Sequence, residues 1–113
     1  MKIPEQGWLL RVFVGESDTW QGRPLYEAIV LKARELHLAG ATVLRGLMGF
    51  GANSRLHTAK ILRLSEDLPM VVEIVDAKEK IDQLMPFIDD VVGEGLVTLE
   101  PVEVIRYRGN VKP

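Results

Sequence analysis

The sequence predicts an α+β fold in which two helices lie on one face of an antiparallel sheet. Two segments with helical periodicity, residues 24–40 and 77–95, are separated by segments rich in β-branched and apolar residues. The expected order is strand, helix, strand, strand, helix, strand, which is typical of a split βαβ arrangement. The chain shows no internal repeat or linker, so we expect a single domain over residues 1–113.

The first strand is predicted over residues 8–16, WLLRVFVGE, because aromatic and β-branched residues dominate it. The first helix follows over residues 24–40. Pro24 suits its first turn, and apolar residues recur at helical spacing while charged residues fill the other face. Gly40 stands where a glycine commonly ends a helix. His37 lies near that end, where it can interact favourably with the helix dipole.

The second strand is predicted from Ala41 to about Met48, and a glycine-rich stretch follows it. Residues 59–65 alternate as a strand does, and residues 70–77 form a second strand-like run. A bulge at Pro69 would join these two runs into one strand.

The second helix covers residues 77–95, and Pro86 is expected to kink or shorten it. The last strand is predicted over residues 96–109, with Pro101 at a bulge or an edge position. Together the elements form a ferredoxin-like βαββαβ domain, with an antiparallel four-stranded sheet and two helices on one face.

Composition excludes several kinds of function. The net charge of −2 gives no reason to expect nucleic acid as a partner. The absence of cysteine excludes disulfides and thiolate metal sites, and the two histidines alone make a poor metal site. No apolar run approaches the roughly 18 residues of a membrane span, and the first residues lack the apolar region of a signal peptide. We therefore expect a cytoplasmic protein that requires no metal.

The stretch GATVLRGLMGFGANSRLH, residues 40–57, concentrates glycines at the end of the second strand. It lacks both the spacing of a dinucleotide fingerprint and the terminal lysine of a Walker loop. Two interpretations remain open from the residues alone. The glycines can serve only a bend or a mobile hairpin, or their amides can converge on an anion beside Arg45, Arg55 and His57.

GATVLRGLMGFG resembles the second-strand signature of the PII signalling proteins, in which Gly-x-Thr-Val and a short spacer precede Gly-Phe-Gly. The matching residues are Gly40, Thr42, Val43, Gly49, Phe50 and Gly51. RYRG, with Arg106 and Arg108, resembles the Arg-x-Arg that ends the last PII core strand. RG-x-x-GFG, DLP and GLVT are most similar to the PII-like domain-of-unknown-function family 190.

This resemblance implies a non-enzymatic regulatory homotrimer that binds an adenine nucleotide in clefts between subunits. It also implies a membrane transport or channel protein as the regulated target. The candidate binding residues, which include those of the anion hypothesis, are Gly40, Thr42, Arg45, Gly46, Gly49, Phe50, Gly51, Arg55, His57, Arg106 and Arg108. No catalytic residue and no metal ligand is assigned.

Two departures from the PII pattern bear on the ligand. The spacer from Val43 to Gly49 is one residue longer, which favours a bulge. In GEGL, residues 93–96, Leu96 stands where the PII phosphate loop usually has lysine, and Glu94 lies between the glycines. Because a triphosphate loses a cation there and meets a like charge, AMP or ADP is expected rather than ATP.

Two other functions on this fold remain open. An acylphosphatase-like hydrolase would need an arginine and an asparagine around a phosphate loop, and Arg11 and Asn53 lie in unrelated contexts. A trimeric protein resembling the divalent-cation tolerance family would share the fold, although the lack of cysteine argues against a soft-metal site.

The trimer is expected on physical grounds as well, because the strands contain more apolar residues than one helical layer can cover. Cyclic assembly would bury such a bare apolar face. The residues that support this expectation are Val12, Val14, Val43, Val72, Ile74, Val102 and Val104.

Overall fold

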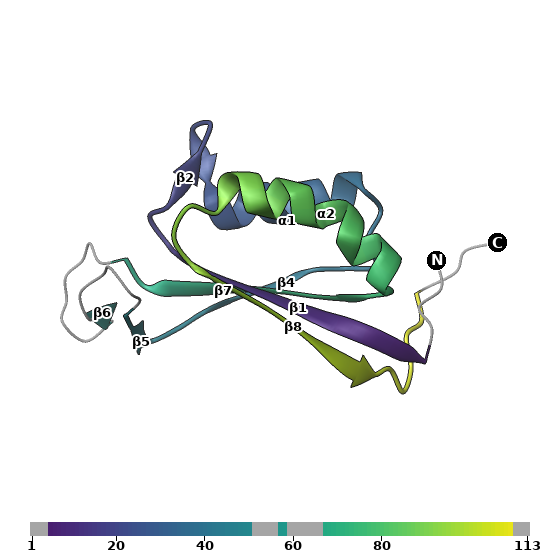
Figure 1. The fold of residues 1–113 in the computed structure, drawn as a ribbon. Helices are drawn as coiled ribbons and strands as arrows, with labels where there is room; N and C mark the ends of the chain where they lie inside the picture. Colours follow the sequence, from purple (N-terminus) through teal and green to yellow (C-terminus); the bar gives the residue numbers. More distant parts are fainter. Residues whose placement is uncertain (1–4, 51–56, 59–66, 110–113) are drawn as a thin grey trace.

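The computed structural model describes residues 5–50, 57–58 and 67–109, and it has the predicted ferredoxin-like α+β fold (Figure 1). Two helices, α1 (Leu25–Glu35) and α2 (Lys78–Val91), lie together on one face of the sheet. The predicted strand over residues 59–65 lies outside the described residues.

One antiparallel sheet has the strand order β4–β7–β1–β8. Its strands are β4 (Thr42–Arg45), β7 (Pro69–Asp76), β1 (Gln6–Gly15) and β8 (Leu96–Glu103). The first strand of the chain is therefore central, paired along one edge with β7 and along the other with β8.

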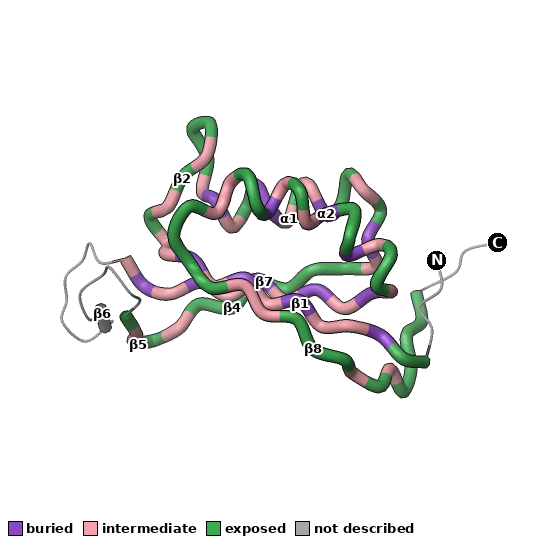
Figure 2. The backbone as a smooth tube through the Cα atoms, in the orientation of Figure 1, coloured by how far each residue is buried: buried purple, intermediate pink, exposed green. Residues whose placement is uncertain are grey.

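The core lies between the helices and one face of the sheet, which we call the covered face. Alternate residues of β1 and β7 are buried there, as the period of two in a strand requires. In Figure 2 the buried parts of these strands lie beneath the helices. The principal core residues are Leu10, Val12, Val14, Leu25, Ile29, Ala33, Met70, Val72, Ile74, Ile81, Leu84 and Ile88.

The other face of the sheet, which we call the open face, carries no helix (Figure 1). The register places on it a second apolar set, made of Leu9, Phe13, Leu44, Val71, Val75, Leu96 and Val102. Most of the residues that supported the trimer expectation lie on the covered face instead. Val12, Val14, Val72 and Ile74 are buried beneath the helices, and Val43 packs against the same core.

Helix α1 ends earlier than predicted, at Glu35, and Gly40 does not terminate it. His37 takes the left-handed conformation with φ 63°. Its N–H donates to the Arg34 carbonyl, and the Leu38 N–H donates to the Ala33 carbonyl, which is the pair of bonds of a Schellman motif. Leu38 is buried, and its packing stabilises this turn. The helix therefore ends with His37, and not a glycine, in the left-handed conformation.

Helix α2 continues through Pro86 to Val91, so Pro86 does not end the helix.

A hairpin that the sequence analysis missed precedes α1, formed by β2 (Thr19–Trp20) and β3 (Arg23–Pro24). Its two turn residues, Gln21 and Gly22, have φ of 50° and 81°, as hairpin turns of type I′ require. Trp20 packs edge-on against Phe87 of α2, with ring centroids 5.1 Å apart.

Two further predicted strands are shorter than expected. The main-sheet part of the second strand ends at Arg45, and β5 (Met48–Gly49) then pairs with β6 (His57–Thr58) outside the main sheet. The last strand ends at Glu103 rather than at residue 109.

Candidate functional site

A pocket of about 680 Å³ lies on the open face at the end where β4 begins. Leu9, Glu73 and Val75 line it from the sheet, because the register places these three side chains on the open face. Residues 39–42, which lead into β4, line one side, and residues 102–107, which end and follow β8, line the other. The pocket thus combines parts of the chain that are far apart in sequence.

The wall that leads into β4 is held by several hydrogen bonds. The fully buried Asp76 carboxylate accepts from the Ala39 N–H at 2.8 Å and from the Ala77 N–H at 2.7 Å. The Lys80 ammonium donates to the Leu36 carbonyl at 2.9 Å. The Tyr107 hydroxyl donates to the Ala39 carbonyl at 2.7 Å. Ala39 is therefore fixed on both its donor and its acceptor side.

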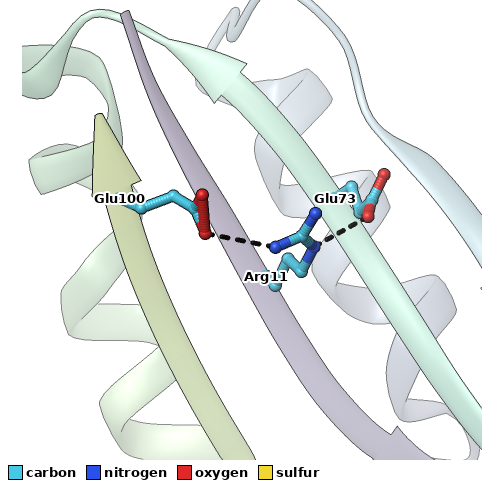
Figure 3. Close-up of polar contacts among 3 residues, drawn as sticks. All are labelled: Arg11, Glu73 and Glu100. Atoms are coloured by element: carbon cyan, nitrogen blue, oxygen red, sulfur yellow. Dashed lines mark hydrogen bonds and ion pairs between the residues drawn. The ribbon is translucent and has the colours of Figure 1, made fainter. Parts of the chain in front are cut away.

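The charges that line the pocket are mixed: Glu73 and Glu103 are acidic and Arg106 is basic. Figure 3 shows Arg11 on β1 between two carboxylates, with Nε 2.9 Å from Glu73 and Nη1 3.3 Å from Glu100. The hydrogen bond to Glu73 raises the pKa of Arg11, so its guanidinium stays charged. Because Arg11 is paired with acids, this arrangement does not favour the acylphosphatase-like interpretation. Asn53 lies outside the described residues.

The glycine-rich stretch lies at the other end of β4. The Gly46 N–H donates to the Pro69 carbonyl at 2.7 Å. A Cβ at Gly46 would lie 2.7 Å from the Pro69 ring, and one at Gly49 would lie 3.0 Å from it. Neither glycine has a positive φ; among the described residues the glycines that do are Gly22 and Gly95. Gly46 and Gly49 therefore allow the chain to approach Pro69 closely. Neither has the left-handed backbone expected of an anion-binding nest.

The remaining described candidates near this end have different surroundings. Arg45 Nη1 lies 2.9 Å from a Glu16 carboxylate oxygen. Phe50 is 73% exposed. His57 pairs with Gly49 through the strand register of β5 and β6. Gly51 and Arg55 lie outside the described residues.

The predicted site residues thus separate into two groups. The pocket group comprises Gly40, Thr42 and Arg106. The hairpin group comprises Arg45, Gly46, Gly49, Phe50 and the backbone of His57. Three residues of extended chain, about 10 Å, separate Thr42 from the start of the hairpin group at Arg45.

Arg106 and Arg108 fall within the last strand as predicted, over residues 96–109, but lie beyond β8 as observed. Strand β8 ends at Glu103, so the alternation of a strand does not govern either side chain. Arg106 lines the pocket, and Arg108 is not among the lining residues.

The family model DUF190, described as "Uncharacterized ACR", matches residues 7–104. This chain belongs to the DUF190 family. A UPF0166 protein of Aquifex aeolicus is 41% identical over 99 residues, which cover 86% of this chain and 91% of that protein. A UPF0166 protein of Methanocaldococcus jannaschii is 30% identical over 102 residues, which cover 89% and 92% of the two chains.

Solved structures similar to this DUF190 protein have the PII fold. CPII, a nitrogen regulatory PII-like protein from Thiomonas intermedia K12, was solved bound to ADP, AMP and bicarbonate; it matches with a TM-score of 0.64 at 15% identity. The match covers 89% of this chain and 90% of CPII. The Bacillus subtilis GlnK–ATP complex matches with a TM-score of 0.56 at 12% identity, over 89% and 85% of the chains. The fold of this DUF190 protein is therefore PII-like.

Sequence reasoning missed two residues that shape the pocket of the DUF190 protein, Asp76 and Tyr107. Asp76 ends the alternate set of β7 whose other members are apolar, and an acid at that place just before α2 is a usable signal. Tyr107 lies between the two singled-out arginines, but its bond to Ala39 spans 68 residues. No local pattern predicts such a contact.

Two kinds of feature are absent from the described part of the DUF190 chain. The described residues contain no group of three or more His, Cys, Asp or Glu side chains arranged to hold a metal ion. None of the described helices has the length and apolar character needed to cross a membrane.

Proposed function

We propose that this DUF190 protein is a PII-like regulatory protein that binds an adenine nucleotide, AMP or ADP rather than ATP, between the subunits of a homotrimer. The observation that carries the proposal is the meeting of Gly40, Thr42 and Arg106 around one pocket. These residues come from the two motifs that resemble PII proteins. A similar fold was solved with ADP and AMP bound, which supports the choice of ligand.

The chemistry of the pocket suits a nucleoside with few phosphates. Leu9, Val75 and Val102 offer an apolar surface to a base. Arg106 offers planar paired donors to phosphate oxygens. Against these stands the carboxylate of Glu103, which opposes each added phosphate, whereas the charge of Glu73 is offset by its ion pair with Arg11. The single phosphate of AMP, with a charge of about −1.5 to −2, is therefore easier to accommodate than a triphosphate.

The residues near GEGL also favour a ligand with few phosphates. A second pocket of about 220 Å³ lies beside this loop and is lined by Asp18 and Glu94, among others. Asp18 and Glu94 would add negative charge in the place where the PII resemblance locates a phosphate loop. Further phosphates would meet like charges there.

A second copy of the chain would explain the separation between the pocket group and the hairpin group. Across a subunit interface, the hairpin group of one copy can approach the pocket group of another. The open face offers the apolar surface for such an assembly, since Leu44 and Leu96 remain 49% and 55% exposed. The predicted mass is about 38 kDa, three times the 12.7 kDa of one chain.

Calorimetric titration with AMP, ADP, ATP and cyclic dinucleotides tests the ligand, and light scattering over a wide concentration range tests the assembly. We expect AMP or ADP to bind more tightly than ATP. No binding of any of these at millimolar concentration would overturn the ligand, and a monomer mass at every concentration would overturn the trimer. The regulated target, a membrane transport or channel protein, is part of the same proposal and calls for affinity capture with and without nucleotide.

A further inference from the structure

The segment that follows β8, residues 104–109, is attached at two described points. At its beginning the Val104 N–H donates to the Glu5 carbonyl at 2.6 Å. Three residues later the Tyr107 hydroxyl reaches the Ala39 carbonyl, at 2.7 Å. In Figure 1 the segment turns up past the end of the sheet. Residues 105 and 106, which lie between the two points, line the pocket.

The two ends of the Tyr107 bond differ in how firmly they are held. The acceptor belongs to Ala39, whose own N–H is bound by the buried Asp76 carboxylate. Tyr107 itself belongs to an exposed segment, in which Ile105 is 81% and Tyr107 45% exposed. The bond therefore joins an exposed segment without helix or strand structure to a fixed acceptor, and the segment carries Arg106.

We propose that Tyr107 is a positioning residue whose bond to Ala39 latches residues 104–107 beside the pocket and so holds Arg106 in place for the ligand. The identity of the ligand rests on the proposed function, whereas the latch does not. The bond is neutral and partly exposed, so its loss should change the opening equilibrium of the segment by about 2- to 10-fold.

Tyr107→Phe removes the hydroxyl and keeps the ring. The chain contains one other tyrosine, Tyr26 on α1, and Tyr26→Phe is the matched control. Trypsin cleaves after arginine, and cleavage after Arg106 reports opening of the segment. Cleavage after Arg11, inside the central strand β1, reports unfolding of the whole domain.

We expect Tyr107→Phe to speed cleavage after Arg106 about 2- to 10-fold, with no change after Arg11, and Tyr26→Phe to behave as wild type. We also expect Tyr107→Phe to weaken AMP or ADP binding by a similar factor, mainly through faster dissociation. Unchanged cleavage after Arg106 would overturn the latch. Faster cleavage with unchanged nucleotide affinity would overturn the positioning role. If the wild-type protein binds no nucleotide, the proposed function fails while the cleavage rates still decide the latch.

Discussion

On the covered face of the sheet Leu10, Val12 and Val72 have no exposed surface, whereas on the open face Leu44 and Leu96 are 49% and 55% exposed. The covered face is almost purely apolar, and the open face mixes apolar side chains with the ion pairs of Arg11. Successive residues of one strand belong to these different surroundings. The comparison indicates that folding depends on the covered face, while the open face is available for ligand and assembly.

The largest effect should come from the covered face. Ile74→Ala truncates a side chain that is 1% exposed and leaves a cavity in the core, which should cost about 2–5 kcal/mol of unfolding free energy. Where the protein is monomeric, Leu44→Ala on the open face should cost less than about 1 kcal/mol in the same urea titration, because less of this side chain is buried within one chain. Equal costs for the two variants would break the distinction between the faces.

The next effect concerns the attachment of β8 to β1. A Cβ at Gly95 would lie 2.5 Å from the Phe13 carbonyl oxygen, whereas a Cβ at Gly93 meets no atom within 4 Å. We expect Gly95→Ala to cost about 1–3 kcal/mol through overpacking against backbone. Gly93→Ala is the control and should change the thermal midpoint little. A Gly95→Ala variant as stable as Gly93→Ala would contradict the close approach that sets this register.

On the open face, Arg106→Ala should weaken AMP or ADP binding about 10- to 100-fold, the loss of one charge-assisted contact worth about 1.5–3 kcal/mol. The measurement is calorimetry, with the trimer mass checked in parallel. Arg34→Ala, on the exposed side of α1, should bind as wild type does.

Arg108→Ala sharpens the same test, because Arg108 is not among the residues that line the pocket. Its loss should weaken binding less than the loss of Arg106. If Arg106→Ala binds like wild type, the anion contact lies elsewhere, and Arg45, now paired with Glu16, is the next residue to test.

The smallest effect is expected within the ion pairs of Arg11. Glu73 lies 2.9 Å from Arg11 and is 29% exposed, whereas Glu100 lies 3.3 Å away and is 55% exposed. Glu73→Gln should therefore lower the urea midpoint more than Glu100→Gln, since exposed pairs contribute little. The difference should shrink in high salt. The reverse order of the two variants would show that the ion pairs are arranged differently in solution.

Much of the fold could be predicted because the element order and the helical stripes are local properties. The assignment of faces could not, because β1 carries no charged or polar side chain on either face except Gln6 and Arg11. Periodicity therefore gave no sign that Val12 and Val14 lie beneath the helices. The end of β8 also depends on its partner: β1 begins at Gln6, opposite Glu103, so the ladder stops there although the alternation continues.

For the candidate site, the resemblance selected Gly40, Thr42 and Arg106, which the structure places around one pocket. It did not predict that Gly46 and Gly49 pack on Pro69, because that contact depends on the path of β7. Asp76 and Tyr107 were missed for a related reason. Both act on Ala39 from positions remote in sequence, and such roles follow from tertiary contacts rather than from local pattern.

The central place of β1 has a consequence for how the chain folds. Its ladder partners come late in the sequence: Arg11 meets Glu73 after 62 residues and Glu100 after 89. Such a topology has high contact order, so the entropy of closing long loops is lost before the sheet forms, and folding is slowed accordingly. During synthesis the first strand emerges with two unpaired edges and stays unpaired until β7 and β8 have been made. Over that interval an apolar strand is open to pairing with other chains, which exposes the nascent protein to aggregation.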